Sequence, residues 1–171
     1  GANLDVYSNT LTANGPLNVQ GTLYSANAIL NLNAWLTLTK DTNFNKLNIK
    51  GDINAAGILM HFPNTAEFNH ISGTVSGVPN IRYYNKRTQT FTGVAGEHYN
   101  FVNMKNEGPL NIKGDVIFDN FYIYNYEGYS TSDITFHNNV TLNPDRFFIE
   151  GTTNKISRIT NGAVIINGTS F

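Results

Sequence analysis

Apolar and polar residues alternate in short runs along almost the whole chain. Runs such as Leu36–Leu38, Leu47–Ile49 and Leu110–Ile112 place an apolar residue at every second position, which is the period of a β-strand with one buried face. Gly, Asn, Asp, Ser or Thr residues separate the runs, as is typical of corners and turns. No segment keeps a 3.6-residue apolar period over three helical turns. The pattern therefore predicts an all-β protein built from many short strands.

One phrase of this alternation occurs three times. The copies span residues 17–23, 47–53 and 110–116, with the sequences LNVQGTL, LNIKGDI and LNIKGDV. Each copy is typical of a strand, a glycine corner and the start of another strand. The copies start 30 and 63 residues apart, and 63 residues divide into three units of about 21, which lies in the range of one solenoid coil. The repeat predicts that residues 1–171 form a single right-handed parallel β-helix, in which every coil presents the same apolar stripe inward.

A β-sandwich is the alternative fold, because it too has short strands with turns at intervals of about 8–12 residues. Hairpins in a sandwich favour Asn-Gly turns, and only three such pairs occur, starting at residues 14, 161 and 167. Asparagine is nevertheless abundant, at 27 of 171 residues. Asparagines at equivalent corners of stacked coils can form hydrogen-bonded ladders, so this excess favours the β-helix.

Two stretches depart from the repeating pattern. Residues 82–96 are richer in charge and threonine, and residues 120–129 are rich in aromatic side chains. We expect one or both to project from the coils as loops or a hairpin. Departures from a repeat are where function is commonly found, so both stretches are candidates for a functional site.

The overall composition narrows the classes of function. Charged residues make up 13% of the chain and the formal net charge is −1, which argues against a nucleic-acid partner. The chain has no cysteine, so disulfides and thiolate metal sites are excluded. No apolar run approaches the roughly 20 residues of a membrane helix, and no membrane insertion is expected. No motif in the chain predicts a cofactor.

Catalytic chemistry has one candidate in the sequence, the carboxylate pair Asp115 and Asp119. Polysaccharide-cleaving β-helices need at least two acidic side chains on one face, and strand alternation can place these two on the same side. Solvated acids beside a turn are the simpler interpretation, and we expect no catalysis. The four histidines, at positions 61, 70, 98 and 137, have no metal-ligand spacing, so no metal site is expected.

Tyrosines supply the main binding candidates. Alternation places Tyr122, Tyr124 and Tyr126 on one face of a strand, and tyrosine offers a flat apolar ring and a hydroxyl for recognition of glycans or proteins. Packing against the flank of the solenoid is the alternative role. The segment 82–87 (RYYNKR) is the second candidate, because arginine makes bidentate contacts with the carboxylates of acidic sugars. The predicted ligand-binding residues are Tyr122, Tyr124, Tyr126, Arg82, Tyr83, Tyr84 and Arg87.

The repeated Leu-Asn-Ile-x-Gly phrases, the excess of Asn, Gly and Thr, the absence of cysteine and the low charge resemble the passenger β-helices of Gram-negative secreted adhesins. The resemblance is to the filamentous haemagglutinin and high-molecular-weight adhesin group, which is exported by two-partner secretion. It covers nearly the whole chain as a style of sequence. It implies an excised, monomeric segment of a longer exoprotein, secreted or at the cell surface, with an outer-membrane secretion partner.

The resemblance also implies a function. Proteins of this group are adhesins that bind host glycans or glycoproteins in host-cell adhesion and virulence, without catalysis. Some carry sugars on Asn-x-Ser/Thr sites, for which Asn139 and Asn167 are the two candidate positions. Two other functions stay open from the sequence: a polysaccharide-acting β-helix, such as a trimeric phage tailspike-like depolymerase fragment, and a purely structural spacer.

Overall fold

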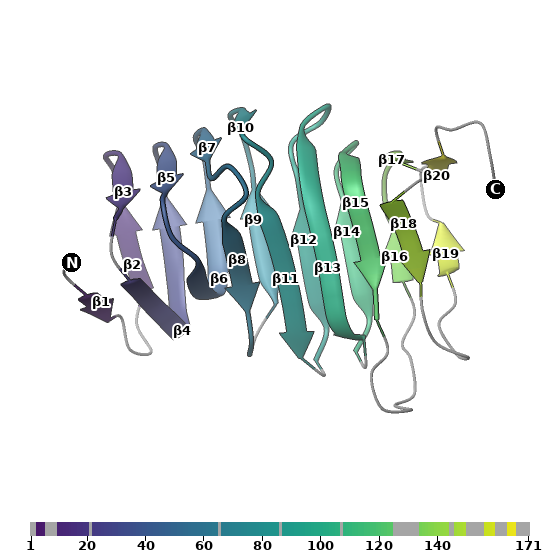
Figure 1. The fold of residues 1–171 in the computed structure, drawn as a ribbon, viewed down its shortest axis with the longest axis horizontal. Coiled ribbons are helices and arrows are strands. Elements are labelled where there is room, and N and C mark those ends of the chain that lie inside the picture. The colour runs from purple at the N-terminus through teal and green to yellow at the C-terminus, as the bar shows by residue number, and fades with distance from the viewer. Residues whose placement is uncertain are drawn as a thin grey trace.

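The chain winds into a right-handed parallel β-helix in a computed structural model (Figure 1). The structure describes residues 3–5, 10–20, 22–64, 66–85, 87–106, 108–124, 134–143, 146–149, 156–159 and 164–166. All strand pairings in this part of the chain are parallel. The predicted β-helix is therefore confirmed, since a sandwich joined by hairpins would pair its strands antiparallel.

Strands from successive coils stack into three faces, named here for their positions in Figure 1. The rear face holds β2 (Thr10–Ala13), β4 (Thr22–Leu32), β6 (Thr42–Ile49), β9 (Glu67–His70), β12 (Gln89–Thr92), β14 (Leu110–Lys113), β16 (Ile134–Phe136) and β19 (Ile156–Ile159). The front face holds β8 (Leu59–Phe62), β11 (Asn80–Asn85), β13 (His98–Asn106), β15 (Ile117–Ile123) and β18 (Phe147–Ile149). The upper face holds β3 (Leu17–Val19), β5 (Leu36–Leu38), β7 (Ile53–Asn54) and β10 (Val75–Ser76).

Three further strands extend these faces, and the long strand β6 connects two of them. β1 (Asn3–Asp5) pairs with the start of β4, whereas β17 (Val140–Leu142) and β20 (Val164–Ile166) continue from the start of β15. β6 belongs to two faces: its residues 42–43 pair with β8 at the front and its residues 46–49 pair with β9 at the rear. One hydrogen-bonded sheet therefore continues from the rear face to the front face, and the upper face is a separate four-stranded sheet.

Inward-facing side chains stack into apolar columns that form the core. Leu30, Leu47, Phe68, Phe91 and Ile112 occupy the same position in five successive coils of the rear face and are 0% exposed. The rings of Phe68 and Phe91 stack with centroids 5.3 Å apart and planes at 23°. Because each fully buried side chain of this kind contributes about 1.5–3 kcal/mol, the columns are the main source of cohesion between coils.

Glycines form corners where successive coils come into close contact. Gly114, in the third copy of the repeated phrase, has a φ of +97°, and a Cβ there would collide with the backbone oxygen of Gly93 in the preceding coil. Gly73 has a φ of +107° and lies in the same way against the backbone of Gly51, in the second copy. Only glycine accepts both the left-handed backbone and the close approach. The predicted strand, corner and strand of the phrase is confirmed.

The three copies of the phrase do not occupy equivalent positions in the coils. The first copy contributes β3 to the upper face, whereas the second and third contribute β6 and β14 to the rear face. Three coils after Leu47, the residue in register with it is Ile112 and not Leu110. The offset of 63 residues therefore falls two residues short of three coils, and it does not measure a constant coil length.

Asparagines in neighbouring coils hydrogen-bond to one another. On the rear face, one ladder consists of Asn31, Asn48 and Asn69. On the front face, a second ladder consists of Asn80, Asn100 and Asn120. The Asn48 amide donates to Asn31 at 2.7 Å and the Asn69 amide to Asn48 at 2.8 Å, across coils of 17 and 21 residues. The expected ladders exist, but these two lie on outward strand faces. The pair Asn33 and Asn14, joined at 2.8 Å, is at a bend.

The stretch 82–96 does not project as expected. Residues 82–85 lie within β11 and residues 89–92 form β12, so both segments are parts of the coil. Arg82, Thr90 and Thr92 are outward positions of strands whose alternate residues, such as Tyr83 and Phe91, are buried. In the second stretch, residues 120–123 complete β15, and residues 125–129 lie outside the described residues.

A buried polar network lies next to a corner of the core. His70 is 1% exposed; its Nε2–H donates to the carbonyl oxygen of Gly51 at 2.9 Å, and its Nδ1 accepts from the Tyr99 hydroxyl at 2.8 Å. The Tyr99 oxygen in turn accepts from the backbone N–H of Val94 at 3.1 Å. Burial lowers the pKa of His70. The network therefore holds a neutral imidazole in a fixed tautomer.

Candidate binding surfaces

The strand register brings the two predicted binding segments onto one face. Arg82 of β11 neighbours Val102 of β13, Val102 neighbours Tyr122 of β15, and Tyr122 neighbours Phe148 of β18. These side chains alternate along their strands with buried residues such as Phe121, so they point outward on the front face. Adjacent strands lie about 4.8 Å apart, which places Arg82 about 10 Å from Tyr122.

Aromatic rings cluster at the β15 end of this face. Tyr122 and Tyr124 stack with centroids 6.0 Å apart and planes at 25°, and Tyr124 lies 5.8 Å from the ring of Phe148. Phe148 is 44% exposed and Tyr84, on β11, is 41% exposed. The surface formed by Arg82, Tyr84, Val102, Met104, Tyr122, Tyr124 and Phe148 is called the aromatic face below.

The other predicted binding residues have different positions. Tyr83 is fully buried, and its hydroxyl donates to the carbonyl oxygen of Thr90 at 2.6 Å. Burial raises the pKa of Tyr83 well above its ordinary value. Tyr83 is thus a core residue and not a surface contact, because alternation along β11 turns it inward between Arg82 and Tyr84. Arg87 is exposed just beyond β11, and Tyr126 lies outside the described residues.

A histidine adjoins the basic end of the aromatic face. His61 of β8 neighbours Arg82 in register, its Nδ1 lies 3.1 Å from the Asn43 side-chain oxygen, and Tyr84 packs edge-on against its ring at 6.4 Å. Burial and the nearby Arg82 charge lower the pKa of His61. His61 Nε2 and Arg82 Nε are buried without a hydrogen-bond partner among the residues that the structure describes. This end of the face therefore combines a guanidinium, a neutral imidazole and an exposed phenol.

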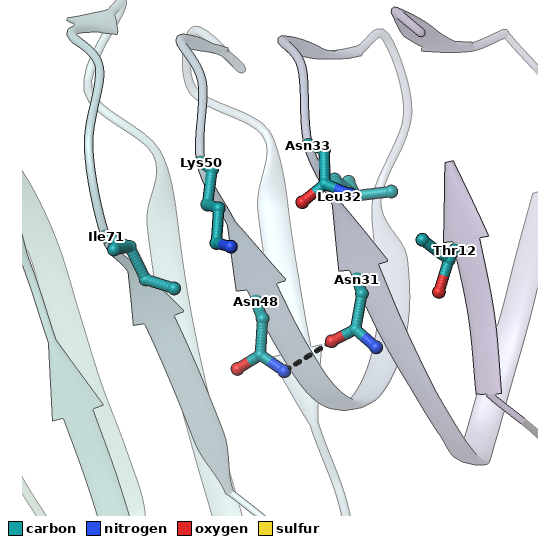
Figure 2. A pocket seen from close by; sticks show the side chains of 7 residues that line it. All are labelled: Thr12, Asn31, Leu32, Asn33, Asn48, Lys50 and Ile71. Atoms are coloured by element: carbon teal, nitrogen blue, oxygen red, sulfur yellow. Dashed lines mark hydrogen bonds between the residues drawn. The ribbon is translucent and has the colours of Figure 1, made fainter. Parts of the chain in front are cut away.

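The rear face carries a groove that the sequence did not indicate. It has a volume of about 480 Å³. Figure 2 shows the residues that line it, which are Thr12, Asn31, Leu32, Asn33, Asn48, Lys50 and Ile71. The groove runs between two outward columns of the stacked strands: Asn31 and Asn48 are register neighbours in one column, and Lys50 and Ile71 follow the ends of β6 and β9 in the other.

The groove is rich in hydrogen-bond donors. The Asn48 amide donates to the Asn31 side-chain oxygen (Figure 2), so the Asn31 amide nitrogen keeps its two N–H groups on the groove side. Lys50 is exposed and adds a positive charge, and Ile71 is 54% exposed and adds an apolar wall. Such a surface suits an anionic or carbonyl-bearing group. Its residues come from four successive coils, which explains why no local motif predicted it.

The candidate acid pair is divided between two separate contacts. Asp119 accepts from His98 Nδ1 at 2.8 Å on the preceding coil, and Asp115 accepts from the backbone N–H of Asn139 at 2.9 Å on the following coil. Within the described ranges, no cluster of three or more His, Asp or Glu side chains could hold a metal ion. Asn139, a candidate glycosylation position, is exposed, and Asn167 lies outside the described residues.

One further surface was not predicted from the sequence. Trp35, the only tryptophan in the chain, is 56% exposed and immediately precedes β5 on the upper face. Alternation with the buried Leu36 and Leu38 was a signal that Trp35 points outward. Its neighbours on the next two coils, Asp52 and Thr74, could not be assigned without the register.

Comparisons with protein-family models, with curated proteins and with solved structures find no match to this chain. The described residues contain no helix long and apolar enough to cross a membrane. The β-solenoid architecture is consistent with the resemblance to adhesin passenger domains, and it is also the architecture of other β-helical proteins. Functional inference for this chain therefore depends on the chemistry of its surfaces.

Proposed function

We propose that the chain is a non-catalytic segment of a secreted or surface-displayed adhesin that binds host glycans or glycoproteins through the aromatic face. The fuller protein would be exported with an outer-membrane secretion partner. The β-helix provides a rigid support, and the binding chemistry lies in side chains that point away from the core.

The alignment of Arg82, Tyr122 and Phe148 across adjacent strands is the observation that carries the proposal. Sugar rings have apolar faces that pack on aromatic rings, and the tyrosine hydroxyls add hydrogen bonds. Arg82 supplies a charge that attracts carboxylated or sulfated sugars and can contact a carboxylate bidentately. The stacked rings of Tyr122 and Tyr124 are already ordered by strand packing, which reduces the entropy lost on binding.

The test is binding of the intact chain to a broad panel of neutral, sialylated and sulfated glycans, with product release measured in the same wells. We expect retained ligands and no cleavage. The double variant Tyr122→Ser/Tyr124→Ser should lose at least about tenfold in affinity, which corresponds to about 1.4 kcal/mol. Arg82→Ala should weaken acidic ligands selectively, and that difference should diminish at high salt.

Lys113→Ala is the matched control, because Lys113 is an exposed outward residue of β14 on the rear face. It should bind like the unmodified chain, and all variants should retain the β-sheet circular dichroism signal. Absence of glycan binding, or binding that the tyrosine variant leaves unchanged, would contradict the proposal. Product release would instead favour the polysaccharide-acting alternative and make Asp115 and Asp119 the residues to substitute.

A further inference from the structure

The upper face holds the exposed tryptophan in a fixed position relative to its neighbours. The Trp35 carbonyl oxygen accepts from the Leu17 N–H of the preceding coil at 3.0 Å, and the Leu36 N–H donates to the Asp52 carbonyl oxygen of the next coil at 2.8 Å. These backbone bonds place Trp35 and Asp52 at the same position of successive coils. Trp35, which is 56% exposed as a residue, is therefore held beside Asp52.

A depression of about 220 Å³ lies beside the indole. It is lined by Trp35, Leu36, Thr37, Asp52, Ile53, Asn54, Thr74 and Ser76. Leu36 and Ile53 are buried in the core, so the accessible side chains are the indole and five small polar side chains from three coils. The volume is below the roughly 300–1,000 Å³ of pockets that enclose drug-sized ligands, and it suits a single ring.

The polar side chains of this depression retain unused hydrogen-bonding capacity. Thr37, Asn54 and Ser76 are consecutive outward residues in register on β5, β7 and β10. Their side chains make no hydrogen bond to any residue in the part of the chain that the structure describes. On the rear and front faces, by contrast, asparagines of successive coils bond to one another in ladders. Among the described residues, an amide and two hydroxyls beside Trp35 are therefore available to a ligand.

Asp52 supplies a fixed acceptor. Its Oδ1 accepts from the backbone N–H of Thr74 at 2.8 Å and from the Thr74 hydroxyl at 3.1 Å. These two bonds lower the pKa of Asp52, and its second carboxylate oxygen has no partner among the described residues. The lining contains no lysine or arginine, so an acidic ligand would be repelled.

We propose that this depression is a binding site for a neutral pyranose, a single sugar unit of a glycan. The sugar ring packs on the Trp35 indole, and adjacent hydroxyls donate to the Asp52 carboxylate and exchange hydrogen bonds with the Asn54 amide and Thr37 hydroxyl. The site is shallow, so we expect weak binding in the millimolar range, as for other small contacts of this kind. It is separate from the aromatic face in residues and in ligand charge, and it does not depend on the proposed function.

Trp35 itself provides the measurement, because all tryptophan fluorescence of the chain comes from this residue. The intact chain is titrated with neutral oligosaccharides of the gluco, galacto, manno and N-acetylglucosamine series. We expect at least one series to change the emission saturably and to protect Trp35 from quenching by acrylamide. A failure of all four series to alter the emission would overturn the proposal.

Three variants separate this site from a nonspecific effect. Asp52→Asn and Asn54→Ala keep the indole and should each weaken the active saccharide about tenfold, whereas Tyr122→Ser/Tyr124→Ser on the front face should leave the titration unchanged. Equal saccharide affinity in Asp52→Asn, Asn54→Ala and the unmodified chain would overturn the proposed contacts. A loss of the signal in the tyrosine variant would show that the sugar binds at the aromatic face instead.

Discussion

Replacing Phe91 by alanine should remove a large part of the stability of the β-helix. Phe91 is 0% exposed and lies at the centre of an aromatic cluster. Its ring stacks on Phe68 at 5.3 Å and contacts Tyr99 at 5.1 Å, Phe101 at 5.8 Å and Phe118 at 5.1 Å. These neighbours come from the preceding, the same and the following coils, so the cavity cannot close without moving several strands.

The expected loss in the free energy of unfolding is about 4 kcal/mol, within the roughly 3–5 kcal/mol typical of buried Phe→Ala substitutions. This is a large fraction of the about 5–15 kcal/mol by which domains are stable. Phe148→Ala is the matched control: Phe148 is 44% exposed, and its substitution should cost about 1 kcal/mol.

The assay is urea unfolding followed by far-UV circular dichroism and by Trp35 fluorescence. Phe91→Ala should move the midpoint to much lower urea than Phe148→Ala does. Equal destabilisation by Phe91→Ala and Phe148→Ala would refute the reasoning, because it would place Phe91 outside a tightly packed core.

Two further substitutions test the corner and the buried network. Gly114→Ala should destabilise the fold more than Gly96→Ala. Both glycines have a positive φ, but only at Gly114 would the added Cβ meet a backbone oxygen, that of Gly93. Equal melting temperatures of the two variants would contradict this. The folded-state pKa of His70 is lowered from an ordinary value of 6.5, so its contribution to stability is full above about pH 6.5 and is lost as the pH falls through the lowered pKa. Thermal melting of His70→Gln should depend less on pH between about 6.5 and 5 than melting of the unmodified chain, and identical pH profiles would count against the network.

Much of the fold could be predicted from the sequence because stacking repeats the same local requirement in each coil. Alternation identified Leu47 and Ile49 as inward residues, and both are 0% exposed. The exact coil register could not be obtained in this way, because the coils differ in length and identical phrases occupy different faces. Leu47 and Leu110 have the same local sequence but are two residues out of register.

The candidate sites were predicted less completely, since a surface on a β-helix is assembled from several coils. Arg82 and Tyr122 were identified separately, but their alignment depends on the intervening strand β13. Tyr83 was misassigned because it was grouped with its sequence neighbours. It lies two residues after the buried Ile81, so strand alternation turns both side chains into the core. For Trp35, alternation along the strand predicts an outward side chain. Its neighbour Asp52 could be identified only from the register between coils.

The register across the front face is the central claim, because it brings Arg82, Tyr122 and Phe148 together. The chain has no cysteine, so introduced pairs can be cross-linked without interference. Val102→Cys/Tyr122→Cys joins register neighbours about 4.8 Å apart, within the range of disulfide Cα separations. Arg82→Cys/Tyr122→Cys spans two strand spacings and is too wide. Under mild oxidation, the account predicts rapid disulfide formation in the first variant and little in the second, as measured by intact mass. Faster cross-linking of the second pair would contradict it.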